Sequence, residues 1–355
     1  MKYFDKIKTA SLKEDALILA IESSCDETAA SVVKGGREIL SSVIMSSMTE
    51  HIPFGGVVPE IASRMHTTAI SLTVEKAVKE AGITLKDLDA IAVTYGSGLI
   101  GALLVGVSYA KALAYSLGIP LVPVNHVRGH VSAGYLTDKA LKPPFICLLA
   151  SGGHTAIIDV RDYYNYEVLG GTLDDAAGEA FDKVARVLGL EYPGGPNVER
   201  LAKEGENNIE LPAMLKGKKG YDFSYSGLKT AVINYVHNKE QKGEYYSRED
   251  LACSFQSSAL DVLVKKALSA VKEKGYKVLS VGGGVSANGY LREKLVAECK
   301  KKGVKLVLPE KKLCTDNASM IGAEGYLQYL NKNFADLTLN ANAFIEITAT
   351  KVFNG

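Results

Sequence analysis

Two of the six histidines, His126 and His130, are four positions apart, with Val127 directly after the first. On a helix this spacing places both imidazoles on one face, where they could bind one metal ion. The metallopeptidase motif H-E-x-x-H needs a glutamate as general base after its first histidine, and Val127 cannot take that role. Asp316, which follows a predicted strand and a short loop, could supply a third ligand. Two imidazoles and a carboxylate with open positions suit Fe(II) or Zn(II), and the alternative is a pair of exposed or capping histidines.

Three carboxylates lie close together in the segment Glu22-Ser-Ser-Cys-Asp26-Glu27, between two predicted strands. A turn built only to hold phosphate should avoid acids, because like charges repel. We therefore expect Asp26 or Glu27 to act on a reacting amine or on a metal-bound group, and the sequence does not decide between the two. The alternative is that these carboxylates face solvent or pair with a lysine.

A glycine-rich turn, Gly282–Gly284, follows a predicted strand and precedes a helix that opens near Asn288. Such a turn lets backbone N–H groups approach a ligand, and Asn288 could bind a ribose or a base, or could only cap the helix. Asp182 lies well inside another predicted helix. The helix dipole stabilises carboxylates only in the first turn, so it does not explain an acid at this position. The rigid loop Tyr192–Pro196 would lie near Asp182 if that helix ended at Gly189.

The segment Tyr95–Gly101 contains the spacing G-x-G-x-x-G between a predicted strand and a predicted helix, as in dinucleotide-binding sites. Those sites also need an acidic residue about 20 positions later, at the end of the next strand. Here the next strand ends at Asn125, and the first acid after it is Asp138. We therefore expect these glycines to allow close packing of a helix against a sheet.

Strand-like and helix-like patterns alternate along the chain, which is typical of an α/β fold with crossover connections. Apolar runs predict strands over Leu17–Ile21, Ala29–Val33, Ile91–Tyr95, Leu121–Val124, Phe145–Leu149, Ala156–Val160, Val278–Val281 and Lys305–Leu308. Apolar residues three and four positions apart predict helices over Met65–Ala81, Gly101–Leu117, Ala177–Leu188, Arg248–Glu273 and Gly289–Lys302.

Two of these segments, Leu17–Val33 and Phe145–Val160, resemble each other: each has a strand, a turn of small polar residues, an acid or His, a Thr and a second strand. Matched hairpins predict two similar lobes. Turns of Ser and Gly leave backbone N–H groups free to face an anion, so two such turns could hold a phosphate chain across a cleft. A duplicated α/β fold of the acetate and sugar kinase, Hsp70 and actin type explains this better than two unrelated hairpins.

The 355 residues include 41 Lys and Arg and 40 Asp and Glu, so nucleic-acid binding would need a local basic patch or a partner. Hydrophobic residues make up 47% and charged residues 23%, which excludes disordered, collagenous and coiled-coil classes.

Five widely spaced cysteines without a C-x-x-C pair fit a reducing cytosol. We expect no signal peptide, and Lys111 interrupts the most membrane-like stretch, Tyr95–Ala110.

Nine motifs occur in one order along the chain: IESSCDET, PFGGVVPEIASRMH, GSGLIGALLVG, NHVRGH, ASGGHT, DDAAGEAFDKVARVLGLEYPGGP, DFSYSGLKTAV, GGGVSANGYLR and CTDNASMIGAEG. Together they closely resemble the bacterial type of the tRNA N6-adenosine threonylcarbamoyltransferase family (TsaD), formerly labelled O-sialoglycoprotein endopeptidases. The resemblance covers roughly Leu17 to Leu330. Residues 1–15 and 332–355 lie outside it, and the sequence assigns them no role.

The resemblance implies a duplicated two-lobed fold of the acetate and sugar kinase, Hsp70 and actin type. Residues 15–140 would form the N-terminal lobe, on which a helix of about 317–331 packs back, and residues 141–316 the C-terminal lobe, with a metal and nucleotide cleft between them. The implied activity transfers a threonylcarbamoyl group from threonylcarbamoyl-AMP to the N6 amine of the adenosine 3′ of the anticodon, in tRNAs that read codons beginning with A, and releases AMP. The family implies a cytoplasmic enzyme with a paralogous dimerising subunit (TsaB-like) and a small ATPase (TsaE-like), and no membrane.

By motif match, the resemblance makes His126, His130 and Asp316 the ligands of one divalent metal ion, with Fe(II) favoured over Zn(II), and Asp26 and Glu27 the candidate catalytic residues. It assigns adenylate binding to Leu149, Ala150, Ser151, Gly152, Gly153, Asp182, Gly195, Asn288 and, where bacterial members often have Asp, Glu199. A small-molecule kinase of this fold would need Mg²⁺ rather than two histidines, and the family's non-catalytic paralogue lacks these histidines. Their presence therefore favours the active enzyme.

Overall fold

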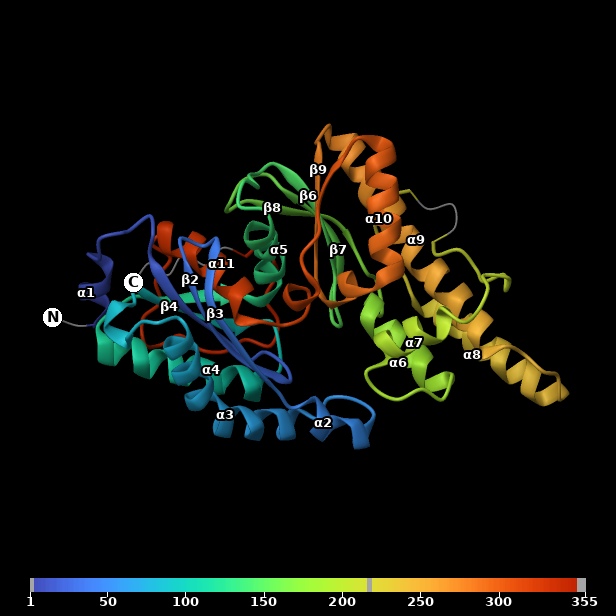
Figure 1. The fold of residues 1–355 in the computed structure, drawn as a ribbon, viewed down its shortest axis with the longest axis horizontal. Coiled ribbons are helices and arrows are strands. Elements are labelled where there is room, and N and C mark those ends of the chain that lie inside the picture. Colours follow the sequence, from blue (N-terminus) through green and yellow to red (C-terminus); the bar gives the residue numbers. More distant parts are fainter. Residues whose placement is uncertain (1–2, 216–218, 350–355) are drawn as a thin grey trace. The chain divides into compact units, whose positions relative to one another are not determined.

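The computed structural model describes residues 3–215 and 219–349. The chain divides into two compact units (Figure 1). Unit 1 comprises Met1–Leu141 and Asp316–Gly355, and unit 2 comprises Lys142–Thr315. Unit 1 is therefore built from both ends of the chain, with unit 2 inserted between them.

A mixed sheet forms the centre of unit 1. Its strands are β1 (Leu17–Glu22), β2 (Glu27–Lys34), β3 (Glu38–Ser46), β4 (Ala90–Gly96) and β5 (Leu121–Asn125). They lie in the order β3-β2-β1-β4-β5, with β1 antiparallel to β2 and parallel to β4, which is parallel to β5. The carboxyl ends of β1, β4 and β5 therefore meet at one edge of the sheet.

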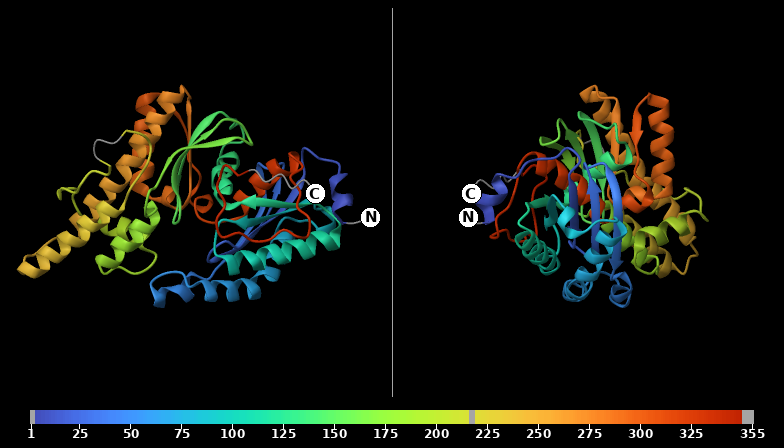
Figure 2. Two further views of the ribbon diagram at one scale, coloured as in Figure 1. Left: turned by 180° about the vertical axis from the view of Figure 1, so that it is seen from behind. Right: turned by 60° about the vertical axis from the view of Figure 1, so that its left-hand side comes forward.

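Helices cover both faces of this sheet. The helices of unit 1 are α1 (Tyr3–Lys8), α2 (Met48–His51), α3 (Pro59–Glu80), α4 (Ile100–Leu117), α5 (His126–Thr137) and α11 (Ala318–Leu330), with 3-10 turns η1 (Ile52–Phe54) and η2 (Leu85–Asp87). Figure 2 shows α3 and α4 together on one face, where Leu19 and Ile21 of β1 join their apolar core. Ile18 and Ala20 point to the other face and pack with α5 and α11, as the period of two along a strand requires.

Unit 2 repeats this arrangement. Its strands are β6 (Phe145–Ala150), β7 (Thr155–Val160), β8 (Tyr166–Gly171), β9 (Val278–Gly282) and β10 (Lys305–Val307). They lie in the order β10-β9-β6-β7-β8, with β6 antiparallel to β7 and parallel to β9. Strand β6 thus has the position of β1, and the predicted duplication is confirmed.

The helices of unit 2 form one apolar core with this sheet, in which Ile146 and Leu148 of β6 pack with Phe181 and Phe255. They are α6 (Ala177–Val187), α7 (Gly194–Ala202), α8 (Ser226–Lys242), α9 (Arg248–Lys274) and α10 (Gly289–Lys302), with 3-10 turns η3 (Gly284–Ala287) and η4 (Lys311–Leu313).

Every strand and helix predicted from the apolar pattern is present, with shifts at the ends, but the prediction for Tyr192–Pro196 was wrong. We expected a rigid loop there, whereas α7 begins at Gly194. Proline is compatible with the first turn of a helix, because the N–H that it lacks would have no partner within the helix.

Helix α4 is long and apolar enough to cross a membrane, and it is the stretch for which we expected no membrane span. Its residues Val107, Ala110 and Ala114 are buried in the core of unit 1. A Cβ added at Gly101 would lie 2.5 Å from the Oγ of Ser63 on α3, so glycine allows the two helices to pack closely. A core helix meets the same length and composition criteria as a membrane span, so this helix is only weak evidence for one.

Candidate functional site

The three predicted metal ligands come together in unit 1. His126 and His130 lie on α5, directly after β5, and Asp316 lies just before α11. The Oδ1 of Asp316 is 3.5 Å from the Nε2 of His126 and 3.2 Å from the Nε2 of His130. One ligand atom from each residue lies within 4.8 Å of the other two. Asn125 caps α5 by accepting a hydrogen bond from the N–H of Val127 at 2.8 Å, which fixes the start of the helix.

The environment of His130 fits a metal ligand. Its side chain is 1% exposed, its Nε2 lies 3.2 Å from Asp316 without forming a hydrogen bond, and among the described residues its Nδ1 has no hydrogen-bond partner either. Leaving a buried polar atom unpaired is unfavourable, so a ligand aimed at the Nε2 of His130 would remove a penalty. Two imidazoles and a carboxylate are donors that Fe(II) and Zn(II) accept. The group could therefore hold a metal ion.

Glu22, at the end of β1, contacts the Nδ1 of His126 and so fixes the orientation of its imidazole ring. Its Oε1 accepts a hydrogen bond from the N–H of Ser24 at 2.6 Å, and its Oε2 accepts one from Thr94 at 2.6 Å. The Nδ1 of His126 lies 3.1 Å from this Oε2. Because an ionised carboxylate only accepts, the Nδ1 of His126 must carry a proton, so a metal ion would bind at its Nε2 in place of the second proton.

Charge stabilises this contact. Burial alone would lower the pKa of His126, but the nearby carboxylates of Asp316 and Glu22 outweigh it and raise the pKa to about 9. Burial raises the pKa of Glu22, and the charge and hydrogen bond of His126 more than reverse that effect, so the pKa of Glu22 is lowered. Without a metal, the pair is therefore a buried imidazolium and carboxylate at neutral pH.

A first prediction concerns pH. Below about pH 9 a divalent ion must displace a proton from His126, whose pKa is raised to about 9, so metal affinity should rise between about pH 6.5 and 8.5. The increase should approach tenfold per pH unit, because one proton is exchanged for one ion. Competition with a chromophoric chelator at several pH values measures this. A constant affinity across the range would contradict it.

A second prediction concerns Glu22→Gln, which keeps the shape but removes the negative charge that His126 contacts. Loss of a carboxylate behind a metal-binding histidine typically weakens metal affinity by about 10- to 100-fold. The same chelator competition measures the change, with thermal unfolding as the check on folding. Glu75→Gln, at an exposed position of α3, is the matched control and should leave the affinity unchanged. Equal affinities for both variants would show that Glu22 does not position His126.

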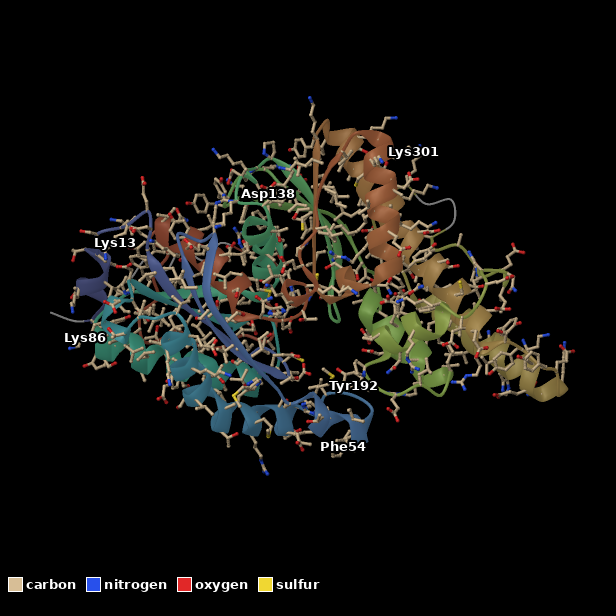
Figure 3. The ribbon with its side chains drawn as sticks, viewed as in Figure 1. Lys13, Phe54, Lys86, Asp138, Tyr192 and Lys301 are labelled. Atoms are coloured by element: carbon tan, nitrogen blue, oxygen red, sulfur yellow. The ribbon has the colours of Figure 1, made fainter. Side chains whose placement is uncertain are left out.

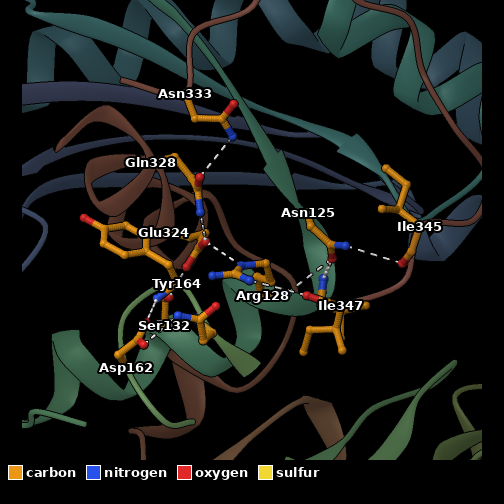
Figure 4. Close-up of polar contacts among 12 residues, drawn as sticks. Asn125, Arg128, Ser132, Asp162, Tyr164, Glu324, Gln328, Asn333, Ile345 and Ile347 are labelled. Carbon is orange, nitrogen blue, oxygen red and sulfur yellow. Dashed lines mark hydrogen bonds and ion pairs between the residues drawn. The ribbon is translucent and has the colours of Figure 1, made fainter. Parts of the chain in front are cut away.

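A buried polar network joins α5, which carries His126 and His130, to α11, which follows Asp316 (Figure 4). The Nε of Arg128 donates to the Oε1 of Glu324 at 2.8 Å, with side chains 3% and 0% exposed. Ser132 donates to the Oε2 of Glu324 at 2.7 Å. A Cβ added at Gly129 would lie 2.7 Å from a side chain of α11, so the two helices are in close contact. This network ties α5 to α11 and thereby orients His126 and Asp316 relative to each other.

The C-terminal segment, to which the sequence assigned no role, covers the ends of β4 and β5. The Nδ2 of Asn125 donates to the carbonyl of Ile345 at 3.4 Å, and Arg128 donates to the carbonyl of Ile347 at 3.4 Å (Figure 4). The N–H of Ile345 donates to Ser97 at 2.9 Å. The tail thus supports the start of α5, which carries His126 and His130, and residues 350–355 lie outside the described residues.

The turn of the first hairpin is braced by two side chains. Ser47 donates from its backbone N–H and its hydroxyl to the carbonyl of Asp26, both at 2.9 Å. His66 lies 2.8 Å from the carbonyl of Cys25 and 2.7 Å from the hydroxyl of Thr28. A neutral imidazole can donate to the first and accept from the second, and burial lowers the pKa of His66 accordingly. No pattern in the sequence indicated this role of His66.

Asp26 and Glu27 lie in this turn. Asp26 is buried, at 9% exposure, so it does not face solvent. Among the described residues, neither carboxylate forms an ion pair with a lysine. Burial, followed by the charges of Asp26 and Asp316 and a hydrogen bond with Asp26, raises the pKa of Glu27 to about 9. At neutral pH, Glu27 therefore holds a proton.

The first candidate turn of unit 2 joins β6 to β7. Leu149 and Ala150 are the buried last residues of β6, so only their backbone could reach a ligand. Ser151 is buried as well, whereas Gly152 and Gly153 are exposed, and a Cβ built on either glycine would meet nothing within 4 Å. The turn therefore presents backbone rather than side chains.

Two further segments of unit 2 pack against this turn. Gly283, after β9, has a φ of 91°, and a Cβ there would lie 2.3 Å from the carbonyl oxygen of Ala150. Only glycine fits this position. The N–H of Gly178, at the start of α6, donates to the carbonyl of Ser151 at 3.2 Å. The glycine turns predicted from the sequence thus meet at the carboxyl ends of β6 and β9, where α/β folds commonly bind ligands.

Asp182 lies near the segment 192–196, as predicted. Its Oδ1 accepts a hydrogen bond from the N–H of Gly194 at 2.7 Å, at the first residue of α7. Burial raises the pKa of Asp182, partly offset by the N–H groups of Gly194 and Gly195. A Cβ added at Gly195 would meet nothing within 4 Å. Asp182 therefore holds the start of α7, beside an unobstructed glycine.

Asn288 and Glu199 meet at the start of α10. Asn288 caps this helix by accepting from the N–H of Leu291 at 3.1 Å, and its Nδ2 donates to Gln256 of α9 at 2.8 Å. Glu199 accepts from the N–H of Gly289 at 3.1 Å. The capping role considered for Asn288 is confirmed, and its contact with a nucleotide stays a prediction.

Some supporting residues were not predicted from the sequence. They include Gln256, Arg128 and Glu324, and Glu22 was noted only as one of three hairpin carboxylates. A usable signal exists for Glu324, which is the single carboxylate within the apolar and small-residue segment Ala318–Leu330. A lone acid that the periodicity places inside a core needs a buried partner.

Solved structures share the fold. Full-length HypF in its phosphate- and nucleotide-bound form aligns with a TM-score of 0.61 and 16% identity, over 90% of this chain and 47% of that chain. Component A of the Acidaminococcus fermentans (R)-2-hydroxyglutaryl-CoA dehydratase aligns with a TM-score of 0.50 and 14% identity, over 88% and 97%. At these identities the likeness shows the fold alone. The molecule is a duplicated two-lobed α/β protein of the acetate and sugar kinase, Hsp70 and actin type, with a group that could hold a metal ion.

Within this class the chain belongs to the TsaD family, the tRNA N6-adenosine threonylcarbamoyltransferases, whose family model matches residues 38–323. The enzyme of that description from Clostridium botulinum (strain 657 / Type Ba4) is 55% identical over 331 residues, 93% of this chain and 97% of the relative. The one from Clostridioides difficile (strain 630) is 54% identical over 328 residues, 92% and 97%. The resemblance seen in the motifs is confirmed. The protein is a transferase that acts in the threonylcarbamoyladenosine modification of tRNA.

Proposed function

We propose that the protein transfers the threonylcarbamoyl group of threonylcarbamoyl-AMP to the N6 amine of the adenosine 3′ of the anticodon, in tRNAs that read codons beginning with A. The observation that carries this proposal is the group of buried His126, buried His130 and partly exposed Asp316 on the strand-end edge of unit 1, in a chain of the TsaD family. The family's non-catalytic paralogue lacks these histidines, so their presence supports an active enzyme.

In this reaction the N6 nitrogen forms a bond to the carbamoyl carbon, and the bond from that carbon to the phosphate oxygen of AMP breaks. The amine loses one proton, and AMP leaves with the bonding electron pair. Negative charge develops on the carbonyl oxygen during the attack, so donors or a cation must stabilise it. The enzyme therefore has to position two substrates, accept a proton and neutralise charge.

We propose Fe(II) as the ion held by His126, His130 and Asp316, with Zn(II) as the alternative, because two histidines and one carboxylate suit both. When bound, the ion would act as a Lewis acid and template for the threonylcarbamoyl group and the phosphate. Glu22 keeps the Nε2 of His126 available for this task. Asp26 would take the proton of the amine, because Glu27 already holds a proton at neutral pH, and Glu27 is the alternative that its own variant tests.

The AMP part of the substrate is assigned to unit 2, at Leu149, Ala150, Ser151, Gly152, Gly153, Asp182, Gly195, Glu199 and Asn288. The exposed glycines of the β6–β7 turn support phosphate binding by backbone N–H groups. The cap of α10 at Asn288 and the unobstructed Gly195 support contacts with the ribose or adenine. We propose that Glu199 keeps Asn288 in place through the N–H of Gly289.

A third prediction tests this assignment. Asp182→Ala and Asn288→Ala should each weaken AMP binding by at least about tenfold, a loss of about 1.4 kcal/mol, because each removes a polar contact and loosens a helix start. Calorimetry measures the affinity for AMP, and elemental analysis should show unchanged metal content. Lys242→Ala, at the exposed end of α8, is the control. Normal AMP affinity in both variants would show that the proposed pocket is wrong.

We propose that the enzyme works in the cytoplasm with a TsaB-like dimerising subunit and a TsaE-like ATPase. The near-zero net charge of +1 supports a need for partners in tRNA binding. The decisive assay combines the purified protein, threonylcarbamoyl-AMP, both partners and unmodified tRNA, and detects threonylcarbamoyladenosine by nucleoside mass analysis. Absence of product, together with ATP-dependent phosphorylation of a small molecule, would instead identify a kinase of the same fold.

A further inference from the structure

The charge of this nearly neutral chain is strongly segregated. Residues 265–312 contain 13 Lys and Arg but 4 Asp and Glu, a formal charge of +9, whereas the whole chain has +1 and the remainder therefore −8. A local excess of this size within a neutral protein indicates a surface for a polyanion rather than a general attraction. The sequence analysis required such a local patch for nucleic-acid binding.

The structure gathers part of this excess in one groove. The groove has a volume of about 790 Å³ and lies along α9 and α10 in unit 2. Four lysines line it: Lys265 and Lys272 from α9, and Lys294 and Lys302 from α10. Figure 3 shows Lys301, the neighbour of Lys302, at the end of α10.

Two carboxylates, Asp261 and Glu298, line the groove as well, which leaves the lysines in excess. Lys294 lies 3.4 Å from Asp261, whereas Lys265, Lys272 and Lys302 are exposed and have no ion pair among the described residues. Lysines in the last turn of a helix favour its dipole, which explains Lys272 and Lys302 individually. That effect does not reach Lys265, in the middle of α9, and does not require lysines of two helices to line one groove.

The groove leads away from the proposed nucleotide turns. Helices α9 and α10 each end at a glycine just before the parallel strands β9 and β10, so the two helices run in the same direction. Near the amino end of α10, Asn288 contacts Gln256 of α9. From Gln256 to Lys272, α9 rises about 24 Å at about 1.5 Å per residue, which is long enough for several nucleotides.

We propose that this groove, defined by Lys265, Lys272, Lys294 and Lys302, binds the phosphate backbone of the substrate tRNA. The inference rests on the proposed function, in which the adenosine to be modified must reach the nucleotide turns while the rest of the tRNA needs another support. Lysine binds phosphate as a flexible point charge, which suits a contact that positions RNA without reading its sequence. Asp261, at the end of the groove nearest Asn288, pairs with Lys294 and leaves the other three lysines for the RNA.

The test is a triple charge reversal, K265E/K272E/K302E. Binding of unmodified tRNA, measured by fluorescence anisotropy with the partner proteins present, should weaken at least about tenfold at about 0.1 M salt. The slope of log affinity against log salt should become shallower by about 2 to 3, because each lost phosphate contact removes about 0.7 to 0.9. In steady-state transfer, the KM for tRNA should rise while kcat stays unchanged. AMP affinity by calorimetry and thermal unfolding should match the parent protein.

The matched control is K79E/K86E/K139E, which changes the net charge equally at exposed lysines of unit 1. An equal loss of tRNA affinity in the control would overturn the proposal, because net charge alone would then explain the effect. Retained tRNA affinity with lost binding of a partner protein would also overturn it, and would assign the groove to an acidic protein surface. If the parent protein binds tRNA but makes no threonylcarbamoyladenosine, the proposed transfer fails and the groove is still tested by the binding data.

Discussion

Replacing both His126 and His130 with alanine should abolish stoichiometric metal binding. Only Asp316 would remain of the three residues whose ligand atoms lie within 4.8 Å of one another, and a single partly exposed carboxylate does not hold a transition metal ion against a chelator. Elemental analysis of the purified protein measures the metal content. Transfer of the threonylcarbamoyl group should fall below detection, a larger effect than the roughly 10- to 100-fold loss of affinity expected for Glu22→Gln.

The control for this variant is His237→Ala, at an exposed position of α8. It removes an imidazole that surface binding of metal could use, and it should leave the metal content unchanged. AMP binding should persist in the double variant, because the proposed nucleotide turns lie in unit 2. Unchanged metal content after loss of both histidines would refute the assignment of the metal site.

Asp26→Asn should retain AMP binding and metal but lose most of the transfer activity. The substitution keeps the size of the side chain and one acceptor oxygen, but it removes the basic oxygen that could take the amine proton. Positioned acid–base groups contribute about 10² to 10⁴ in rate, so a loss in that range is expected. Single-turnover transfer, measured with saturating threonylcarbamoyl-AMP and tRNA, separates this step from substrate binding.

Glu27→Gln distinguishes the two carboxylates of the turn. Because the pKa of Glu27 is raised to about 9, its carboxyl is neutral at pH 7 to 8, and the neutral amide of glutamine resembles it. We therefore expect Glu27→Gln to lose much less activity than Asp26→Asn. Wild-type transfer by Asp26→Asn would instead assign the proton to Glu27 or to the phosphate of the substrate.

The sequence by itself predicted the α/β class, the duplication and the three residues His126, His130 and Asp316 that form the candidate metal site. These features depend on local patterns: apolar alternation along strands, matched hairpin turns, and the four-residue spacing of His126 and His130, which a helix converts directly into one face. Strands β3 and β8 and helix α8 were not predicted. Strand β3 has a polar, partly exposed pattern, β8 ends in two glycines, and the fully buried positions of α8 form a narrow stripe of Leu228, Val232 and Val236.

Only the tertiary structure decided how these residues are supported. Glu22 meets His126 across 104 positions because β1, β4 and β5 end at the same edge, and Arg128 meets Glu324 across 196 positions because α5 and α11 share one face of the sheet. The lysines of α9 and α10 line one groove because both helices run in one direction to parallel strands. Contacts of this kind depend on strand order and helix packing, which periodicity does not encode, since each pattern specifies which face of an element is buried but not which element covers it.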